Sequence, residues 1–106
     1  MLPGRYPSVI MVMIWGINSV PAHADTIHVT IDQLVFAPGE LKAKAGDTIT
    51  WINRDIVAHT ATMGGGFDVM IEATKSASLV LTNAGIVEYY CRFHPNMKGR
   101  IAITPK

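Results

Sequence analysis

Apolar and polar residues alternate through most of the chain after position 25, with the period of two that is typical of half-buried β-strands. Ile27, Val29 and Ile31, for example, are separated by His28 and Thr30. Glycine, proline and asparagine divide this region into short segments, as turn residues do between strands. The pattern predicts strands over residues 27–31, 34–36, 40–44, 48–53, 58–62, 76–82, 86–91 and 100–104.

Seven to eight short strands without an amphipathic helix predict an all-β fold, a Greek-key β-sandwich. The least regular part is the segment 64–75, which begins with three consecutive glycines. Because glycine accepts many backbone conformations, we expect this segment to be a flexible surface loop. No internal repeat divides the chain, so a single domain is expected after the N-terminal segment.

Residues 1–24 have the order of a secretory signal peptide. Arg5 precedes an apolar stretch at positions 9–17, and Ala22 and Ala24 form a small-residue cleavage pattern before Asp25. The apolar stretch is well short of the roughly 20 residues of a membrane-spanning helix. We therefore expect cleavage after Ala24 and a periplasmic location for residues 25–106. The alternative is an uncleaved anchor that tethers the same domain to a membrane.

Removal of 24 of the 106 residues would leave 82, enough for one small domain. The remaining eight basic and eight acidic residues balance, so bulk charge does not indicate a nucleic-acid partner. A domain this small usually needs a disulfide, a metal or assembly for stability, and a single cysteine excludes an internal disulfide. A bound metal would meet that need, and we expect a soluble monomer without membrane insertion.

The single cysteine, Cys91, is followed by His94 and Met97 at three-residue steps. Alternation along 86–91 places Cys91 on the same face as Val87 and Tyr89, away from the charged Glu88, and so toward the core. A tight loop through Pro95 would then let three side chains converge. Thiolate, imidazole and thioether are soft ligands that suit one copper ion. A chance grouping around a structural cysteine is the competing interpretation.

Such a site needs a second imidazole, and His59, after the strand that contains Trp51, is favoured over His28. A copper carrier without electron transfer is an alternative, since Met63 and Met70 could bind Cu(I). An enzyme with Cys91 as nucleophile and a histidine as base is another, although no carboxylate partner suggests itself. Zinc could occupy the same ligands but offers no redox chemistry. We expect a protein that is not an enzyme.

The chain resembles the cupredoxin family of small blue-copper proteins, the plastocyanin and azurin group, over residues 42–104. The family's motifs occur here in order. They are Gly46-Asp47, Trp51-Ile52-Asn53, His59, Ala84-Gly85, Tyr89-Tyr90-Cys91, His94-Pro95 and Met97-Lys98-Gly99. Two residues between Cys91 and His94, and two between His94 and Met97, are similar to the short ligand loop of the amicyanins.

The resemblance implies a cupredoxin-like domain in which His59, Cys91 and His94 are strong copper ligands and Met97 is a weak axial one. It implies a periplasmic carrier of single electrons through one type 1 copper ion, Cu(I)/Cu(II). A redox enzyme, namely a dehydrogenase, would be the donor and a c-type cytochrome the acceptor. Phe93, His94 and Pro95 would form the electron port and docking surface, unless Phe93 packs into the core.

The chain also departs from the family. Thr60 stands where an asparagine commonly braces the cysteine loop, and Arg92 and Phe93 replace the common Thr/Ser-Pro pair. These changes affect the hydrogen bonds around the copper and therefore its reduction potential. Together with Lys98 and Arg100, Arg92 predicts a basic rim that would favour an acidic partner.

Overall fold

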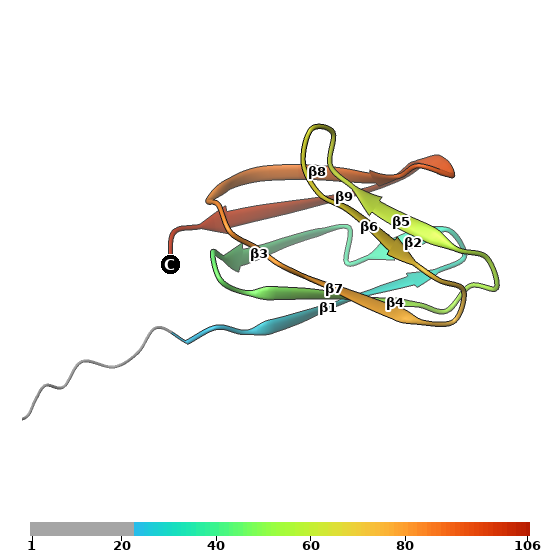
Figure 1. Ribbon diagram of the computed structural model, residues 1–106, viewed down its shortest axis with the longest axis horizontal. Coiled ribbons are helices and arrows are strands. Elements are labelled where there is room, and N and C mark those ends of the chain that lie inside the picture. The colour runs from blue at the N-terminus through green and yellow to red at the C-terminus, as the bar shows by residue number, and fades with distance from the viewer. Residues whose placement is uncertain (1–22) are drawn as a thin grey trace, which may run out of the picture.

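The computed structural model describes residues 23–106, which form two β-sheets packed face to face (Figure 1). Most of the expected signal peptide, residues 1–24, therefore lies outside the described residues. Within residues 23–106 there is no helix, and so none long and apolar enough to cross a membrane.

One sheet has four strands in the order β2-β1-β4-β7, and the other has five in the order β3-β9-β8-β5-β6. Strands β1 and β4 pair in parallel, as do β3 and β9, and all other pairs are antiparallel. The strands are β1 (Thr26–Asp32), β2 (Val35–Ala37), β3 (Glu40–Lys44), β4 (Thr48–Asn53), β5 (His59–Thr62), β6 (Asp68–Ile71), β7 (Ser76–Val80), β8 (Gly85–Cys91) and β9 (His94–Thr104).

The prediction of an all-β sandwich is confirmed, but residues 23–106 contain nine strands rather than seven to eight. The additional strand is β6, so the expectation that 64–75 is entirely a loop was wrong. Val69 and Ile71 point inward while Asp68 and Met70 are exposed, which is the strand alternation that the neighbouring glycines obscured. β6 pairs with β5 from His59 to Thr62.

The second correction concerns β9, which begins at His94 rather than at position 100. Its ladder with β8 is irregular, because Cys91 pairs with His94 whereas Tyr90 pairs with Lys98. Pro95, Asn96 and Met97 therefore have no partners in β8, and the proline needs no backbone donor there. This bulge in a continuous strand, rather than a loop, brings His94 opposite Cys91.

The core between the sheets contains an aromatic cluster centred on Tyr89. Its ring meets Phe36 edge-on at 4.8 Å and Trp51 at 5.6 Å, and the Trp51 indole N–H donates to the Tyr89 hydroxyl at 3.2 Å. Burial raises the pKa of Tyr89. This cluster fixes the separation of the two sheets, since Trp51 belongs to β4 and Tyr89 to β8.

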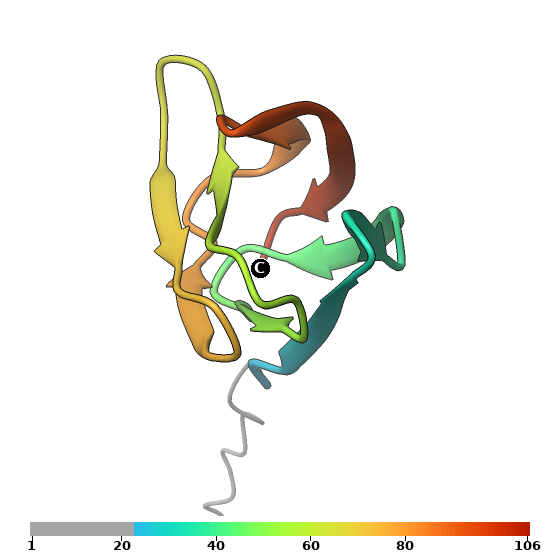
Figure 2. The ribbon, with the colours of Figure 1, turned by 90° about the vertical axis from the view of Figure 1, so that its right-hand side faces the viewer.

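Different parts of the chain form the two ends of the sandwich. The start of β1 and the C-terminus lie at the left end in Figure 1, whereas the β1–β2, β4–β5 and β8–β9 connections lie at the right end. Figure 2 looks onto this second end and shows the three connections around its rim. His59, Cys91 and His94 all belong to strands that begin or end there.

Substitution of Gly99 tests the packing of this core. The glycine faces Tyr89 across β8 and β9, and a Cβ atom at this position would lie 2.6 Å from Tyr89 Cε1 and closer still to the Cζ and hydroxyl atoms. We expect Gly99→Ala to lower the free energy of unfolding by about 1–3 kcal/mol, measured by urea denaturation. Gly64→Ala is the control, since no atom lies within 4 Å of its added Cβ. Equal stability of the two variants would contradict this description of the core.

Candidate metal centre

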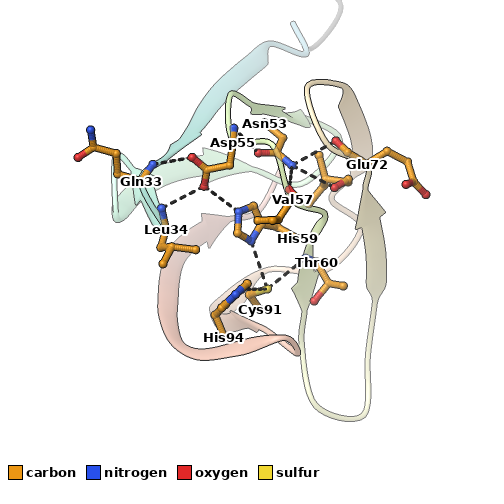
Figure 3. Close-up of polar contacts among 11 residues, drawn as sticks. Gln33, Leu34, Asn53, Asp55, Val57, His59, Thr60, Glu72, Cys91 and His94 are labelled. Carbon is orange, nitrogen blue, oxygen red and sulfur yellow. Dashed lines mark hydrogen bonds and ion pairs between the residues drawn. The ribbon is translucent and has the colours of Figure 1, made fainter.

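Three side chains that can bind a metal converge at the right-hand end of the sandwich. His59 begins β5, Cys91 ends β8 and His94 begins β9, and one ligand atom from each lies within 4.8 Å of the other two. His59 and Cys91 are fully buried, and His94 is half-buried. Figure 3 shows both imidazoles directed at the sulfur.

The distances between these atoms suit ligands of a single ion. Cys91 Sγ lies 3.7 Å from Nδ1 of His59 and 3.7 Å from Nδ1 of His94. Sulfur and nitrogen bound at about 2.3 and 2.0–2.1 Å in a trigonal plane are separated by roughly 3.8 Å. Two imidazoles and a thiolate are also the strong ligands that type 1 copper requires, so the residues present fit one copper ion.

Met97 is 4% exposed and lies three residues after His94, within the unpaired part of β9. Its thioether is a soft donor of the kind that occupies the weak axial position in blue-copper centres. The bulge brings Met97 back into the buried side of the sheet, where Ile101 and Ile103 follow it.

Asp55 orients the His59 ring. Its Oδ2 atom lies 2.8 Å from His59 Nε2, and the carboxylate also accepts hydrogen bonds from the backbone N–H groups of Gln33 at 2.7 Å and Leu34 at 3.0 Å. Burial acts to raise the pKa of Asp55, but the hydrogen bonds from Leu34, His59 and Gln33 outweigh it and lower that pKa. A carboxylate at Nε2 keeps the hydrogen on that nitrogen and leaves Nδ1 free to bind a metal.

The β1–β2 turn that donates to Asp55 consists of Gln33 and Leu34, both in the left-handed backbone region at φ 52° and 64°. Side chains other than glycine occupy this region at a cost in energy. The two hydrogen bonds to one carboxylate offset that cost and fasten the turn to the β4–β5 loop. A hairpin of one sheet thereby supports a ligand of the other sheet.

Asn53 shapes the loop that carries Asp55. Its side-chain amide donates to the carbonyl oxygens of Val57 at 2.9 Å and Glu72 at 3.1 Å, with Ile71 O at 3.3 Å. Its carbonyl oxygen accepts the Asp55 N–H at 2.9 Å. Figure 3 shows these contacts around Asn53. Because Asn53 is 2% exposed, they hold the start of the loop from inside the protein.

Thr60 connects the first histidine to the cysteine loop. Its backbone N–H donates to Cys91 Sγ at 3.4 Å, and its hydroxyl accepts the Arg92 N–H at 2.8 Å. The hydrogen bond to sulfur stabilises negative charge on the cysteine. The hydroxyl therefore braces the residue directly after Cys91, which is the role that the sequence left in doubt when threonine replaced asparagine.

The bracing continues beyond Thr60. Its hydroxyl lies 2.9 Å from that of Thr62, which donates to Asp68 at 2.6 Å, and Asp68 accepts from Arg92 Nε at 3.0 Å. Because Thr62 has only one hydroxyl proton, Thr60 supplies the proton between the two threonines. The hydrogen bond from Thr62, and then that from Arg92, lower the pKa of Asp68. A closed network joins β5, β6 and the residue after the cysteine.

The other residues considered from the sequence lie elsewhere. His28 is exposed on β1, in the opposite sheet from Cys91. Met63 borders a hollow with Phe67 and Leu79, whereas Met70 lies in β6 opposite Thr60, so the two methionines occupy different places. Phe93 is 48% exposed and does not pack into the core.

Sequence reasoning missed Asp55, Thr62 and Asp68. Asp55 carried a usable signal, because a metal-binding histidine usually pairs its second nitrogen with a carboxylate or carbonyl, and Asp55 precedes His59 by four residues. Thr62 and Asp68 carried none, since their contact depends on the pairing of β5 with a strand that was not predicted.

Comparison with known proteins gives a consistent result. The cupredoxin-like domain family model matches residues 6–103. Amicyanin of Paracoccus denitrificans is 33% identical over 84 residues, which are 73% of this chain and 64% of that protein. Amicyanin of Paracoccus versutus is 25% identical over 87 residues, 76% of this chain and 66% of that protein. The chain thus spans slightly less than two thirds of these two relatives.

Solved structures are also similar. A reduced proline-to-phenylalanine mutant of amicyanin superposes with a TM-score of 0.67 at 34% identity, covering 74% of this chain and 81% of the other. The reduced Cu(I) form of a proline-to-glycine mutant of amicyanin superposes with a TM-score of 0.69 at 33% identity, covering 79% and 85%.

The Thr60 hydroxyl tests the bracing of the cysteine loop. Thr60→Val keeps the shape of the side chain but leaves the Arg92 N–H without its acceptor, so we expect a loss of about 1–3 kcal/mol in the unfolding free energy of the metal-free protein. Thr60→Ser should restore most of it. Thr50→Val is the matched control, because the Thr50 hydroxyl meets Ser78 at the exposed surface and its loss should change stability by under about 0.5 kcal/mol. A loss of stability in Thr50→Val that exceeds the loss in Thr60→Val would contradict the bracing role assigned to the Thr60 hydroxyl.

Proposed function

Because this chain belongs to the cupredoxin-like family, we propose that it carries single electrons through one type 1 copper ion. The observation that supports this most directly is the buried Cys91 sulfur with two imidazole Nδ1 atoms at equal distances of 3.7 Å. His59, Cys91 and His94 would be the strong ligands and Met97 the weak axial ligand. A copper ion bound by this set would exchange one electron between Cu(I) and Cu(II).

The protein's part in the transfer is to hold its ligands still. An electron moves quickly only when the ligand positions suit both oxidation states. Asp55 fixes the plane of His59, and Thr60 fixes the sulfur through its N–H and the following residue through its hydroxyl. The Thr60 contacts join β5 to the end of β8, and Asp55 is itself held by the β1–β2 turn, so a ligand shifts only if the sandwich itself deforms.

His94 is the proposed electron port. It is the only one of the three clustered ligands that is not fully buried, and its neighbours Phe93 and Pro95 are exposed. Further exposed apolar side chains come from the loops at this end: Leu34, Ile56 at 88% exposure, and Val57. An apolar rim around a half-buried ligand suits brief contact with a redox partner.

Charge contributes less to the docking surface than the sequence suggested. Arg92 is paired with Asp68 and also stacks over the Phe93 ring at 5.4 Å, so its charge is partly balanced. Lys98 and Arg100 border a surface hollow together with Glu40 and Glu88. We propose that the apolar rim selects the partner, with a smaller contribution from basic residues to the encounter rate.

The partners proposed from the family resemblance are a dehydrogenase as donor and a c-type cytochrome as acceptor. We propose that the protein meets them in the periplasm after export, as a monomer. The carrier role is preferred over a nucleophilic enzyme because Cys91 is 0% exposed and accepts a hydrogen bond from Thr60. Copper storage is less favoured because Met63 and Met70 do not lie together.

Titration of the protein with Cu(II) tests the proposal. We expect one equivalent of copper to give an intense blue absorption that dithionite removes and ferricyanide restores, because a copper thiolate absorbs strongly and both states fit the same ligands. Cys91→Ser should bind Cu(II) without the blue band. A colourless or weakly coloured wild-type complex would contradict a type 1 centre.

Asp55 offers a test of how the protein sets the potential. Its negative charge favours Cu(II) over Cu(I), so we expect Asp55→Asn to raise the reduction potential by roughly 40 mV, equivalent to about 1 kcal/mol for one electron. Asp32→Asn removes an equal charge from an exposed position on β1 and should have a smaller effect, since solvent screens it. Cyclic voltammetry measures both. An unchanged or lowered potential in Asp55→Asn would contradict this role.

A further inference from the structure

A buried carboxylate lies at the opposite end of the sandwich from the metal centre. Asp47 is 1% exposed, and its carboxylate accepts the backbone N–H of Asp25 at 2.9 Å and that of Lys44 at 2.8 Å. These two hydrogen bonds, that from Asp25 first, lower the pKa of Asp47. The carboxylate is therefore charged and directed at the start of β1.

Asp25 is the point at which the described chain joins the fold. Its carbonyl oxygen accepts the Thr48 N–H at 2.9 Å, and the parallel ladder of β1 and β4 begins one residue later. His23 and Ala24 are exposed, and His23 makes a single exposed contact with Asp25 at 3.6 Å. Within residues 23–106, the main-chain pairing of the domain thus starts at the carbonyl oxygen of Asp25, while the Asp25 nitrogen donates to the Asp47 side chain.

The expected cleavage of the signal peptide after Ala24 would free this same Asp25 nitrogen. Hydrolysis of the Ala24–Asp25 peptide bond adds hydroxide from water to the Ala24 carbonyl carbon, which leaves as a carboxylate. The Asp25 nitrogen becomes an amine and, at neutral pH, takes up a proton from solvent to become an ammonium group. A neutral amide donor is replaced by a charged donor at the same place.

We propose that removal of the leader after Ala24 creates an α-ammonium group on Asp25 that forms an ion pair with buried Asp47 and fastens β1 to β4. A charged donor makes a stronger hydrogen bond to a carboxylate than a neutral amide does. Removal of residues 1–24 would then do more than finish export. Cleavage at this bond, and at no other, would add an ion pair that stabilises the domain.

The surrounding charges favour the same change. Lys44 Nζ lies 3.3 Å from the Asp25 carboxylate and 3.5 Å from that of Asp47, so one cation faces two anions before processing. The new ammonium balances this group of charges. Two further titratable side chains lie at this corner among the described residues: Lys106, beside Gly46, and His23, which is removed with residues 1–24.

The position of cleavage matters in this account. A cut after Ala22 would leave an ammonium group on His23, two residues before Asp25, and the Asp25 nitrogen would remain a neutral amide. Only the cut after Ala24 places the charge on the atom that already lies 2.9 Å from Asp47. The intact mass of the exported protein gives the position directly, and a mature chain that begins at His23 would overturn the proposal.

The ion pair itself is tested in metal-free protein, independently of copper. Three forms are compared: residues 25–106 with a free amine, the same chain with an Nα-acetyl group, and residues 23–106. We expect the free-amine form to unfold at a temperature higher by about 4–8 °C than the other two, which should agree with each other. In an Asp47→Asn background the three should unfold together. Equal unfolding temperatures in the wild-type background would overturn the proposal.

Titration of the amine covers the case in which Asp47→Asn fails to fold. The ion pair should raise the pKa of the Asp25 amine above the usual 7.7–8.0 in the folded protein. Its extra stability would then be present below that range and lost as the pH rises through the raised pKa. The gap between free and acetylated forms should close over this interval. An amine pKa at or below the usual value would overturn the proposal.

Discussion

The structure depends on keeping one sulfur atom buried and satisfied. Cys91 ends a central strand with no exposure to solvent, and an unpaired thiolate in such a place would be costly. The Thr60 N–H and two imidazole nitrogens surround it, and each comes from a segment whose position is set by other strands. The bulge in β9, the length of the β4–β5 loop and the hydroxyl network on β5 all serve to bring these groups to the sulfur.

At each end of the sandwich, a carboxylate holds the chain by accepting backbone hydrogen bonds. At the metal end, the Asp55 carboxylate ties the β1–β2 turn to His59, while at the other end the Asp47 carboxylate ties the start of β1 to the turn before β4. Each carboxylate accepts two backbone N–H groups, and in each case β1 is the strand that is held. Because β1 pairs with β4 from Thr26 to Ile31, fastening both of its ends steadies the strand that leads into the His59 loop.

Much of this architecture could be predicted from the sequence. Alternation gave the inward faces of β1 and β8 correctly, because strands with one buried face follow a period of two. It failed for β6, where three glycines dominated the segment. It also failed for the first residues of β9, where Pro95 suggested a loop. The proline is tolerated because a bulge leaves that part of the strand without partners, which only the register of β8 and β9 reveals.

The metal-binding residues were more predictable than the residues that hold them. Spacing in the chain singled out Cys91, His94 and Met97, since a short loop must bring them together. The contact of Asp55 with His59 spans only four residues and had a local signal. The hydrogen bonds to Asp55 from the β1–β2 turn, and that to Asp68 from Arg92, join segments distant in sequence, and no local pattern encodes those. Hydrogen bonds of this kind are properties of the assembled sheets.

X-ray absorption at the copper edge, recorded on the oxidised and the reduced protein, tests the central claim most directly. The account predicts one short copper–sulfur distance and two copper–nitrogen distances that barely change on reduction, because the ligands are held before the metal binds. Loss of a nitrogen ligand or a large lengthening of the copper–sulfur distance on reduction would contradict a rigid site made by His59, Cys91 and His94.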